Sequence, residues 1–166
     1  FQQRLVSSSY TSSEQFGYSV DMSGDGNAVV IGSPFKIKTG ETYQTGGAQI
    51  WLKNEDDTWE FESQLFPPVD VYSSNETDHY FAQAVAIDGT GSRIVIGARG
   101  KNHTVNPVRS DVGAVFVYKN SGVQYYNVES ATSLTGKSVN AEDADGTGFE
   151  FNNDGTKMYI TGYATD

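Results

Sequence analysis

The sequence predicts an all-β fold made of repeated four-stranded antiparallel units, and three observations support this. The composition, with 18 Gly, 10 Tyr and 9 Phe in 166 residues, favours short strands and tight turns. A motif recurs with a period of 65 residues. Within the motif, apolar and polar residues alternate as they do in half-buried strands, and no stretch keeps a helical period over three turns.

The repeat is clearest in residues 16–32 and 81–97, which read FGYSVDMSGDGNAVVIG and FAQAVAIDGTGSRIVIG. A third, partial copy ends at Gly162 and has one extra residue after its turn. It keeps the pattern at Phe149, Phe151, Asp154, Gly155 and Ile160. Residues 47–54 also match residues 113–120. Three copies at one period predict a repeat protein.

Each unit contains four predicted strands. In the first unit, residues 18–22 alternate, residues 23–26 form a tight turn, and residues 28–31 are an apolar strand covered on both faces. Residues 49–52 and 59–65 follow as the third and fourth strands. The second unit repeats this order at 85–87, 94–96, 114–118 and 125–128. Four antiparallel strands per repeat indicate the blade of a β-propeller.

The inner and middle strands of such blades are packed between neighbouring blades, so their apolar residues should be buried. The expected core consists of Val29, Val30, Ile31, Ile50, Val95, Ile96, Phe116 and Ile160.

The order F-G-x-S-V…D-G…V-V-I-G-x-P…G-A resembles the FG-GAP repeats of integrin α-subunit propellers, and more closely their shorter FG-GAP-like variant. In the first unit the motif is carried by Phe16, Gly17, Ser33, Pro34, Gly47 and Ala48. The second unit keeps Phe81, Gly97, Ala98, Gly113 and Ala114, but has Ala82 and Arg99 where Gly and Pro are expected. The resemblance implies a seven-bladed propeller.

The predicted boundaries place the outer strand of a preceding blade and a linker at residues 1–13. One blade then covers 14–78, a second covers 79–144, and a further blade starts at 145–166. A propeller closes with about four to eight blades. We therefore expect this chain to be a segment of a larger propeller, or several copies to close a ring together.

Composition excludes several functions. The net charge of −10 argues against nucleic-acid binding, which needs a basic patch. The absence of Cys excludes disulfides, thiolate metal sites and a cysteine nucleophile. The apolar runs are too short for a membrane-spanning helix.

Long loops are expected on one edge of the blades, where binding residues usually sit. Five of the 11 basic residues fall in the two equivalent loops between second and third strands: Lys36, Lys38, Arg99, Lys101 and Arg109. We expect them to receive a carboxylated or sulfated glycan or an acidic protein, although plain solvation also explains them. Trp51 and Trp59 flank a turn and are expected to lie opposite one another on neighbouring strands, where they either stack on a sugar or simply pack the blade.

Two N-x-T sequons, at Asn75 and Asn102, lie in predicted loops and would carry glycans in a secreted protein. The resemblance to integrin-type repeats implies that calcium could bind in the loop between the first and second strands. Here, however, each of these turns offers only one or two acidic side chains. We therefore expect no cofactor. The weak metal candidates are Asp143, Asp145 and Glu150.

No catalytic residues are expected, because His79 and His103 stand in no nucleophile or metal-protease motif. The sequence thus favours a non-enzymatic extracellular or cell-surface module that binds a protein or glycan through its long loops. A structural repeat of a surface filament and a glycoside hydrolase-type propeller are the alternatives.

Overall fold

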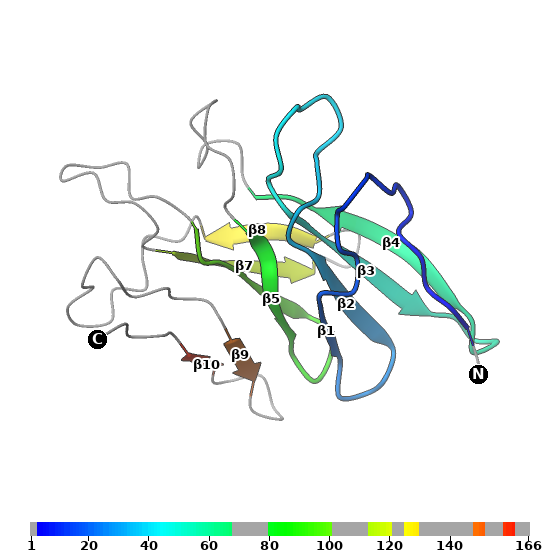
Figure 1. Cartoon of the computed structure of the whole chain (residues 1–166). Helices are drawn as coiled ribbons and strands as arrows, with labels where there is room; N and C mark the ends of the chain where they lie inside the picture. The colour runs from blue at the N-terminus through cyan, green and yellow to red at the C-terminus, as the bar shows by residue number, and fades with distance from the viewer. Residues whose placement is uncertain are drawn as a thin grey trace.

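The computed structural model describes residues 3–67, 80–100 and 113–120 in full, and the backbone of residues 125–129, 148–151 and 158–161. These residues form three antiparallel sheets and no helix (Figure 1). The first sheet contains β1 (Ser19–Met22), β2 (Ala28–Ser33), β3 (Gly47–Lys53) and β4 (Trp59–Leu65). The second contains β5 (Phe81–Ile87), β6 (Arg93–Ala98), β7 (Ala114–Asn120) and β8 (Tyr125–Glu129). The third pairs β9 (Gly148–Phe151) with β10 (Met158–Thr161).

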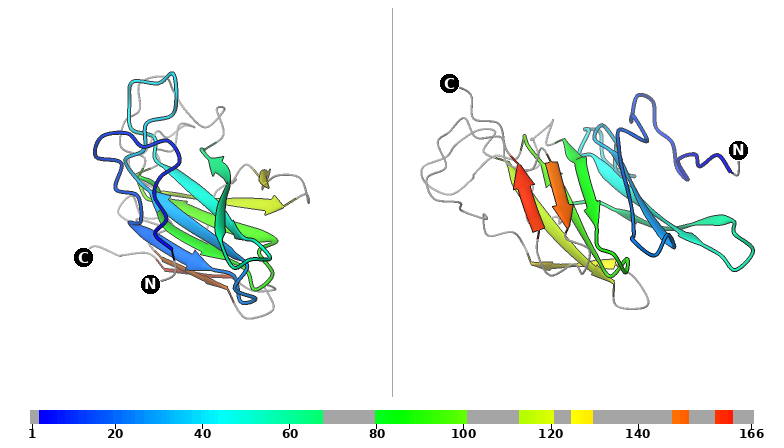
Figure 2. Two further views of the ribbon diagram at one scale, coloured as in Figure 1. Left: turned by 90° about the vertical axis from the view of Figure 1, so that its right-hand side faces the viewer. Right: turned by 90° about the horizontal axis from the view of Figure 1, so that it is seen from below.

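The three sheets are arranged in chain order and meet near their first strands. β5 packs against β1 and β2, and β9 in turn lies beside β5. Figure 2 shows this sequence in its right panel, from the blue first sheet through the green second sheet to the orange and red third. Each sheet thus has an amino-side face, turned toward the preceding unit, and a carboxyl-side face, turned toward the next.

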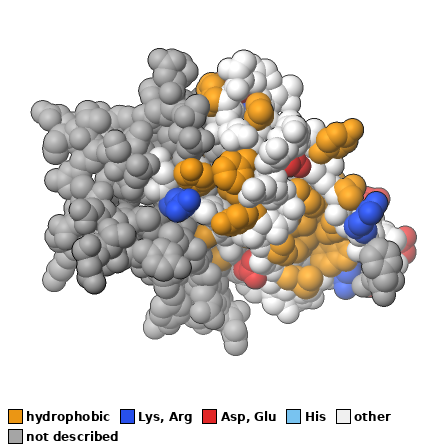
Figure 3. Space-filling view, viewed as in Figure 1, with side chains coloured by type: hydrophobic (Ala, Val, Ile, Leu, Met, Phe, Trp, Pro, Cys, Tyr) orange, Lys and Arg blue, Asp and Glu red, His pale blue; other side chains and the backbone are white. Residues whose placement is uncertain are grey.

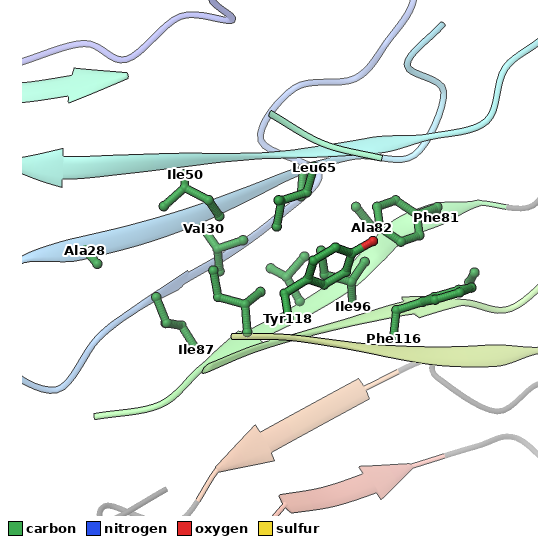
Figure 4. Close-up of a cluster of buried hydrophobic side chains, with 14 residues drawn as sticks. Ala28, Val30, Ile50, Leu65, Phe81, Ala82, Ile87, Ile96, Phe116 and Tyr118 are labelled. Atoms are coloured by element: carbon green, nitrogen blue, oxygen red, sulfur yellow. The ribbon is translucent and has the colours of Figure 1, made fainter. Parts of the chain in front are cut away.

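The main core lies between the first and second sheets (Figure 4). The carboxyl-side face of the first sheet contributes Ala28, Val30, Ala48, Ile50 and Leu65. The amino-side face of the second contributes Phe81, Val85, Ile87, Ile94, Ile96, Phe116 and Tyr118. Burying each of the larger apolar side chains stabilises the fold by about 1.5–3 kcal/mol. Apolar packing therefore holds the two sheets together.

The expected core is confirmed wherever the side chains are described. Its described members are between 0% and 5% exposed: Val29, Val30, Ile31, Ile50, Val95, Ile96 and Phe116. The side chain of Ile160 lies outside the described part, although its backbone is in β10 as expected.

The third strands of the two sheets differ by one residue from the expected match. Gly46 and Gly113, rather than Gly47 and Gly113, have the same backbone conformation, with φ of 80° and 76°. In the ladders, Ile50 lies opposite Val30, whereas Phe116 lies opposite Ile96. A shift of one residue reverses the face of every side chain in a strand. Ile50 and Phe116 therefore point toward each other's sheets.

Polar contacts fix the first sheet against the second. Asp21 Oδ2 accepts a hydrogen bond from the Ile87 main-chain N–H at 2.8 Å, and Asp21 Oδ1 accepts one from Met22 N–H at 2.9 Å. The Ser19 hydroxyl donates to the carbonyl of Ala82 at 2.9 Å. At Gly32 the two backbones are so close that a Cβ would lie 2.1 Å from the Ala82 carbonyl oxygen. Only glycine fits there.

Residues 3–16 cross the amino-side face of the first sheet beside β3 and β4, as Figure 2 shows in its left panel. Gln3 exchanges two side-chain hydrogen bonds with the backbone of Trp59, and Ser8 N–H donates to Gln49 Oε1 at 3.3 Å. Leu5 and Phe16 pack on a small cluster made of Val29, Ile31 and Trp51. Residues 3–7 form no strand, so the expected outer strand of a preceding blade is not seen in this segment.

Candidate functional site

The two ends of the strands carry different connections (Figure 1). Residues 23–27, 54–58 and 88–92 form short turns at one edge. The opposite edge, called the long-loop edge below, holds residues 34–46 between β2 and β3, the end of β4, the start of β5 and the end of β6. Side chains from both sheets therefore meet at the long-loop edge.

Arg99 is the cation at the junction of the two sheets. Its guanidinium carbon lies 4.6 Å from the centre of the Tyr80 ring. Tyr80 in turn meets the ring of Phe35 edge-on at 5.6 Å. Arg99 Nε is buried without a hydrogen-bond partner, and no carboxylate lies within ion-pair distance of Arg99 in the described part of the chain. This arrangement leaves a positive charge oriented on an aromatic support.

Lys38 is the second cation of this edge. Its ammonium lies 6.0 Å from the centre of the Phe66 ring. The Phe66 carbonyl accepts a hydrogen bond from the Tyr118 hydroxyl at 2.9 Å, which ties the end of β4 to the second sheet. Burial raises the pKa of Tyr118, so this hydroxyl remains a donor at neutral pH. Lys38 and Arg99 are thus each paired with an aromatic ring.

Lys36 does not belong to this surface, and the prediction that it contacts a ligand is wrong. Its side chain is 2% exposed, and its ammonium lies 2.6 Å from Glu14 Oε2. It also donates hydrogen bonds to the Ser9 carbonyl and the Ser7 hydroxyl. A lysine turned inward needs such partners, because an unpaired buried charge is costly. Lys36 therefore anchors residues 7–14 to the loop after β2.

Glu14 completes this anchor. Its Oε2 also accepts hydrogen bonds from the Thr11 N–H and hydroxyl, at 2.9 Å and 3.2 Å. Burial by itself raises the pKa of Glu14, but hydrogen bonds from Lys36, Ser7 and Thr11 and the Lys36 charge more than offset it. The pKa of Glu14 consequently lies below its ordinary value, and the pair is ionised at neutral pH.

The turns that would hold calcium in the related repeats are satisfied by protein donors. Asp25 accepts from the Ser23 hydroxyl at 2.6 Å and Asn27 N–H at 3.1 Å, and these bonds lower its pKa. Asp88 is 3% exposed and accepts from the N–H and hydroxyl groups of Thr90 and Ser92. Burial raises the pKa of Asp88, but these hydrogen bonds outweigh it and lower the net value. Each of these two carboxylates therefore accepts hydrogen bonds from side chains and main-chain N–H groups of its own turn.

Trp51 and Trp59 do not face each other as predicted. Trp51 lies opposite Phe61, with the rings edge-to-face at 5.9 Å, and Trp59 lies opposite Lys53. The turn at residues 54–58 sets this register, which is continuous from Lys53 to Trp51 and shifts only beyond Trp51, at a bulge before Ile50. Trp51 is only 8% exposed, and Trp59 packs against the same cluster. Both side chains therefore pack the blade, and the two do not form an open stacking platform.

Several candidates fall outside the described residues, namely Lys101, Arg109, Asn75, Asn102, Asp143 and Asp145. Glu150 lies in β9, where only the backbone is described. Within the part of the chain that is described, no three His, Cys, Asp or Glu side chains are grouped as a metal site.

Sequence reasoning missed Tyr80, Phe35 and Phe66, the rings that support the two cations. Each stands within a few residues of a strand end on the long-loop edge. The strand order predicts that these three residues lie at the long-loop edge. Which ring meets which cation, however, depends on how the two sheets pack. Glu14 was missed because Lys36 was taken as exposed.

Comparison with protein families gives a match over residues 1–50 and 71–118 to the model described as FG-GAP repeat. The first matched segment contains β1, β2 and the start of β3, and the second contains β5, β6 and most of β7. No match was found among curated proteins. The described residues contain no helix long and apolar enough to span a membrane.

Proposed function

Because this chain belongs to the FG-GAP repeat family, whose repeats are the blades of a β-propeller, we propose that it is a non-enzymatic extracellular binding module. Its long-loop edge contacts an anionic protein or glycan. Family membership supports an extracellular or cell-surface location, since FG-GAP repeats typically occur in such proteins. The sequons at Asn75 and Asn102 agree with that location.

The proposal rests mainly on Arg99, whose guanidinium lies over an aromatic ring and has no carboxylate partner in the described part of the chain. In a chain of net charge −10, a cation at the long-loop edge has many carboxylates available, yet Arg99 pairs with none in the described part. Its guanidinium is held on Tyr80 instead. A planar guanidinium offers five N–H donors that match a carboxylate or sulfate. Since Arg99 Nε is buried, the two terminal nitrogens supply the donors for a ligand, and the Tyr80 ring orients them before any ligand arrives.

Lys38 extends the same surface, because it also lies over a ring at the long-loop edge. Contacts of partly exposed cations contribute on the order of 1 kcal/mol or less each. Such a surface acts mainly through steering and selectivity, so binding should weaken with salt. The buried Lys36 contributes nothing to this surface.

The test compares Arg99→Gln with Arg93→Gln. Arg93 is the first residue of the same strand, at the short-turn edge; its side chain is 51% exposed and lies 3.9 Å from Asp88. Binding of the full chain to an array of sulfated and carboxylated glycans, and then to acidic peptides, would be measured at low and high salt. We expect Arg99→Gln to weaken binding about tenfold and to flatten its salt dependence, and Arg93→Gln to change neither.

Equal loss in both variants would mean that overall charge, rather than the long-loop edge, attracts the ligand. Unchanged affinity in Arg99→Gln would refute the proposed site. Turnover of a glycoside panel by the wild-type chain would replace the binding module with the hydrolase alternative.

A further inference from the structure

The loop of residues 34–46 is fixed at its base by Lys36. The Lys36 carbonyl accepts hydrogen bonds from Thr45 N–H at 3.1 Å and from Gly46 N–H at 3.0 Å, and these bonds join the two ends of the loop. Beyond this base the loop projects from the sheets (Figure 1), and Figure 3 shows hydrophobic side chains gathered mainly over the first sheet. The position of the loop therefore depends on what holds Lys36.

Glu14 holds two adjacent residues of this loop. Its carboxylate lies 2.6 Å from the Lys36 ammonium, and its main-chain carbonyl accepts a hydrogen bond from the Phe35 N–H at 3.4 Å. Both side chains of the ion pair are almost fully buried, so separating them would leave a charge without a partner. Glu14 thus fixes the place where the Phe35 side chain leaves the loop.

The ring of Phe35 contacts the ring that supports Arg99. Phe35 and Tyr80 meet edge-on, with ring centres 5.6 Å apart and planes at 87°. The Arg99 guanidinium carbon lies 4.6 Å from the centre of the Tyr80 ring. A continuous series of contacts therefore leads from Glu14 through Phe35 and Tyr80 to Arg99. Packed side chains of this kind can carry energetic coupling between distant groups.

The backbone of Tyr80 also needs support, because its φ is 51°. A bulky residue rarely adopts this conformation, which persists where the surrounding structure fixes it. The Tyr80 carbonyl accepts a hydrogen bond from Gln83 N–H at 3.1 Å, and the neighbouring Phe81 is fully buried and bridges to Gly46. A Cβ at Gly46 would lie 2.2 Å from the Phe81 carbonyl oxygen. The loop thus supports Tyr80 from both of its ends, through Phe35 and through Gly46.

We propose that Glu14 and Lys36 position Arg99 for the anionic ligand. They fix the loop of residues 34–46, and this loop holds the ring of Tyr80 that orients the guanidinium. Lys36 is therefore a positioning residue, although it is not part of the binding surface. The inference rests on the proposed function, because it concerns the same site. A guanidinium that is held in place before binding loses less freedom when a ligand arrives, and this raises affinity.

The first measurement needs no ligand. In NMR spectra of the full chain, the ring current of Tyr80 should shift the side-chain protons of Arg99 upfield. Phe35→Leu removes the ring that contacts Tyr80, and Glu14→Ala removes the partner of Lys36. We expect each variant to lose most of this upfield shift, and Phe35→Tyr, which keeps the ring, to retain it.

The matched controls lie on β4, away from the long-loop edge. Phe61→Leu removes a ring that meets Trp51 edge-on, and Glu60→Ala removes an exposed carboxylate. Neither should move the Arg99 signals. Phe35 is half-buried and lies outside the main core, so Phe35→Leu remains informative even where loss of the Glu14 charge unfolds the chain.

The second measurement is the binding of a heparin-derived sulfated oligosaccharide, followed by isothermal titration calorimetry. Phe35→Leu and Glu14→Ala should each weaken binding by about threefold to tenfold. In an Arg99→Gln background the same two changes should cause no further loss, because they act through Arg99. A merely structural role would weaken binding equally in both backgrounds.

The two measurements separate this inference from the proposed function. Unchanged Arg99 signals in either variant, once that variant is shown to be folded, would overturn the positioning role. Equal weakening of binding in both backgrounds would overturn it as well. If the Arg99 signals move as expected but the wild-type chain binds no sulfated or carboxylated ligand, the positioning of Arg99 is confirmed and the proposed function is refuted.

Discussion

At the residue scale, the ion pair of Lys36 and Glu14 is the most consequential polar contact in the described part of the chain. Both side chains are almost fully buried, and the ammonium lies 2.6 Å from the carboxylate. Removing one member of a buried pair leaves the other charged and unpaired. The pair also holds residues 7–14, so its loss should free the segment that covers β3 and β4.

Lys36→Met should lower the free energy of unfolding by about 3–5 kcal/mol, measured by urea denaturation. The double variant Lys36→Met/Glu14→Leu should recover most of this loss, because it removes both charges. Lys38→Met is the matched control and should cost less than about 1 kcal/mol. Equal losses in the Lys36 and Lys38 variants would contradict the buried pair.

The lowered pKa values of Glu14 and Asp88 predict acid lability. Their ordinary values are 4.5 and 3.8, and a carboxyl group whose pKa is lower in the folded state stabilises the fold above its ordinary pKa. This stability is lost as the pH falls through the folded-state pKa. The free energy of unfolding should therefore fall between about pH 5 and about pH 2, with a shallower slope in Asp88→Asn. A value that stays constant over this range would refute the prediction.

At the scale of strands and sheets, the interface depends on which face each residue takes. Val30→Asp and Val95→Asp each place a charge at a site that is 0% or 1% exposed. Each should cost more than about 4 kcal/mol and prevent folding. Val20→Asp, on the first strand of the first sheet, makes the same change at 57% exposure and should leave the fold intact. Circular dichroism and melting curves would check this. An unchanged melting curve for Val30→Asp would show that the register is wrong.

Asp21 is the polar link between the sheets. Asp21→Ala leaves the Ile87 N–H without its acceptor and should cost about 1–3 kcal/mol of unfolding free energy. Glu60→Ala, at an exposed residue on β4, is the control and should cost less than about 0.5 kcal/mol. Thermal melts of the two variants would compare them. Equal effects would remove Asp21 from the interface.

The strands and their order could be predicted from the sequence because the apolar periods are local. The pairing of the third strands could not, since Gly46 and Gly47 are adjacent and only the positive φ at Gly46 selects the match with Gly113. The burial of Lys36 depends on Glu14, which is 22 residues away. Likewise, Trp51 meets Phe61 because residues 54–58 form the turn and set Lys53 opposite Trp59, a register that the sequence pattern alone does not specify. The match of the third strands, the burial of Lys36 and the pairing of Trp51 each depend on contacts between residues that are distant in the sequence.

At the scale of the whole molecule, the stack of sheets separates three surfaces. The long-loop edge holds Arg99 and Lys38 on aromatic rings, and at the opposite edge Asp25 and Asp88 accept hydrogen bonds within their own turns. The amino-side face of the first sheet is apolar. We therefore expect changes on the apolar amino-side face to leave ligand binding at the long-loop edge unaffected.

Hydrogen–deuterium exchange of the full chain, with and without a heparin-derived sulfated oligosaccharide, tests whether the long-loop edge is the binding surface. Bound ligand should slow exchange of main-chain amides in residues 34–46 and at 99–100, which belong to that edge. Exchange at residues 23–27 and 88–92, in the short turns of the opposite edge, should stay unchanged. Protection confined to the short turns, or no protection at either edge, would show that the long-loop edge does not bind this ligand.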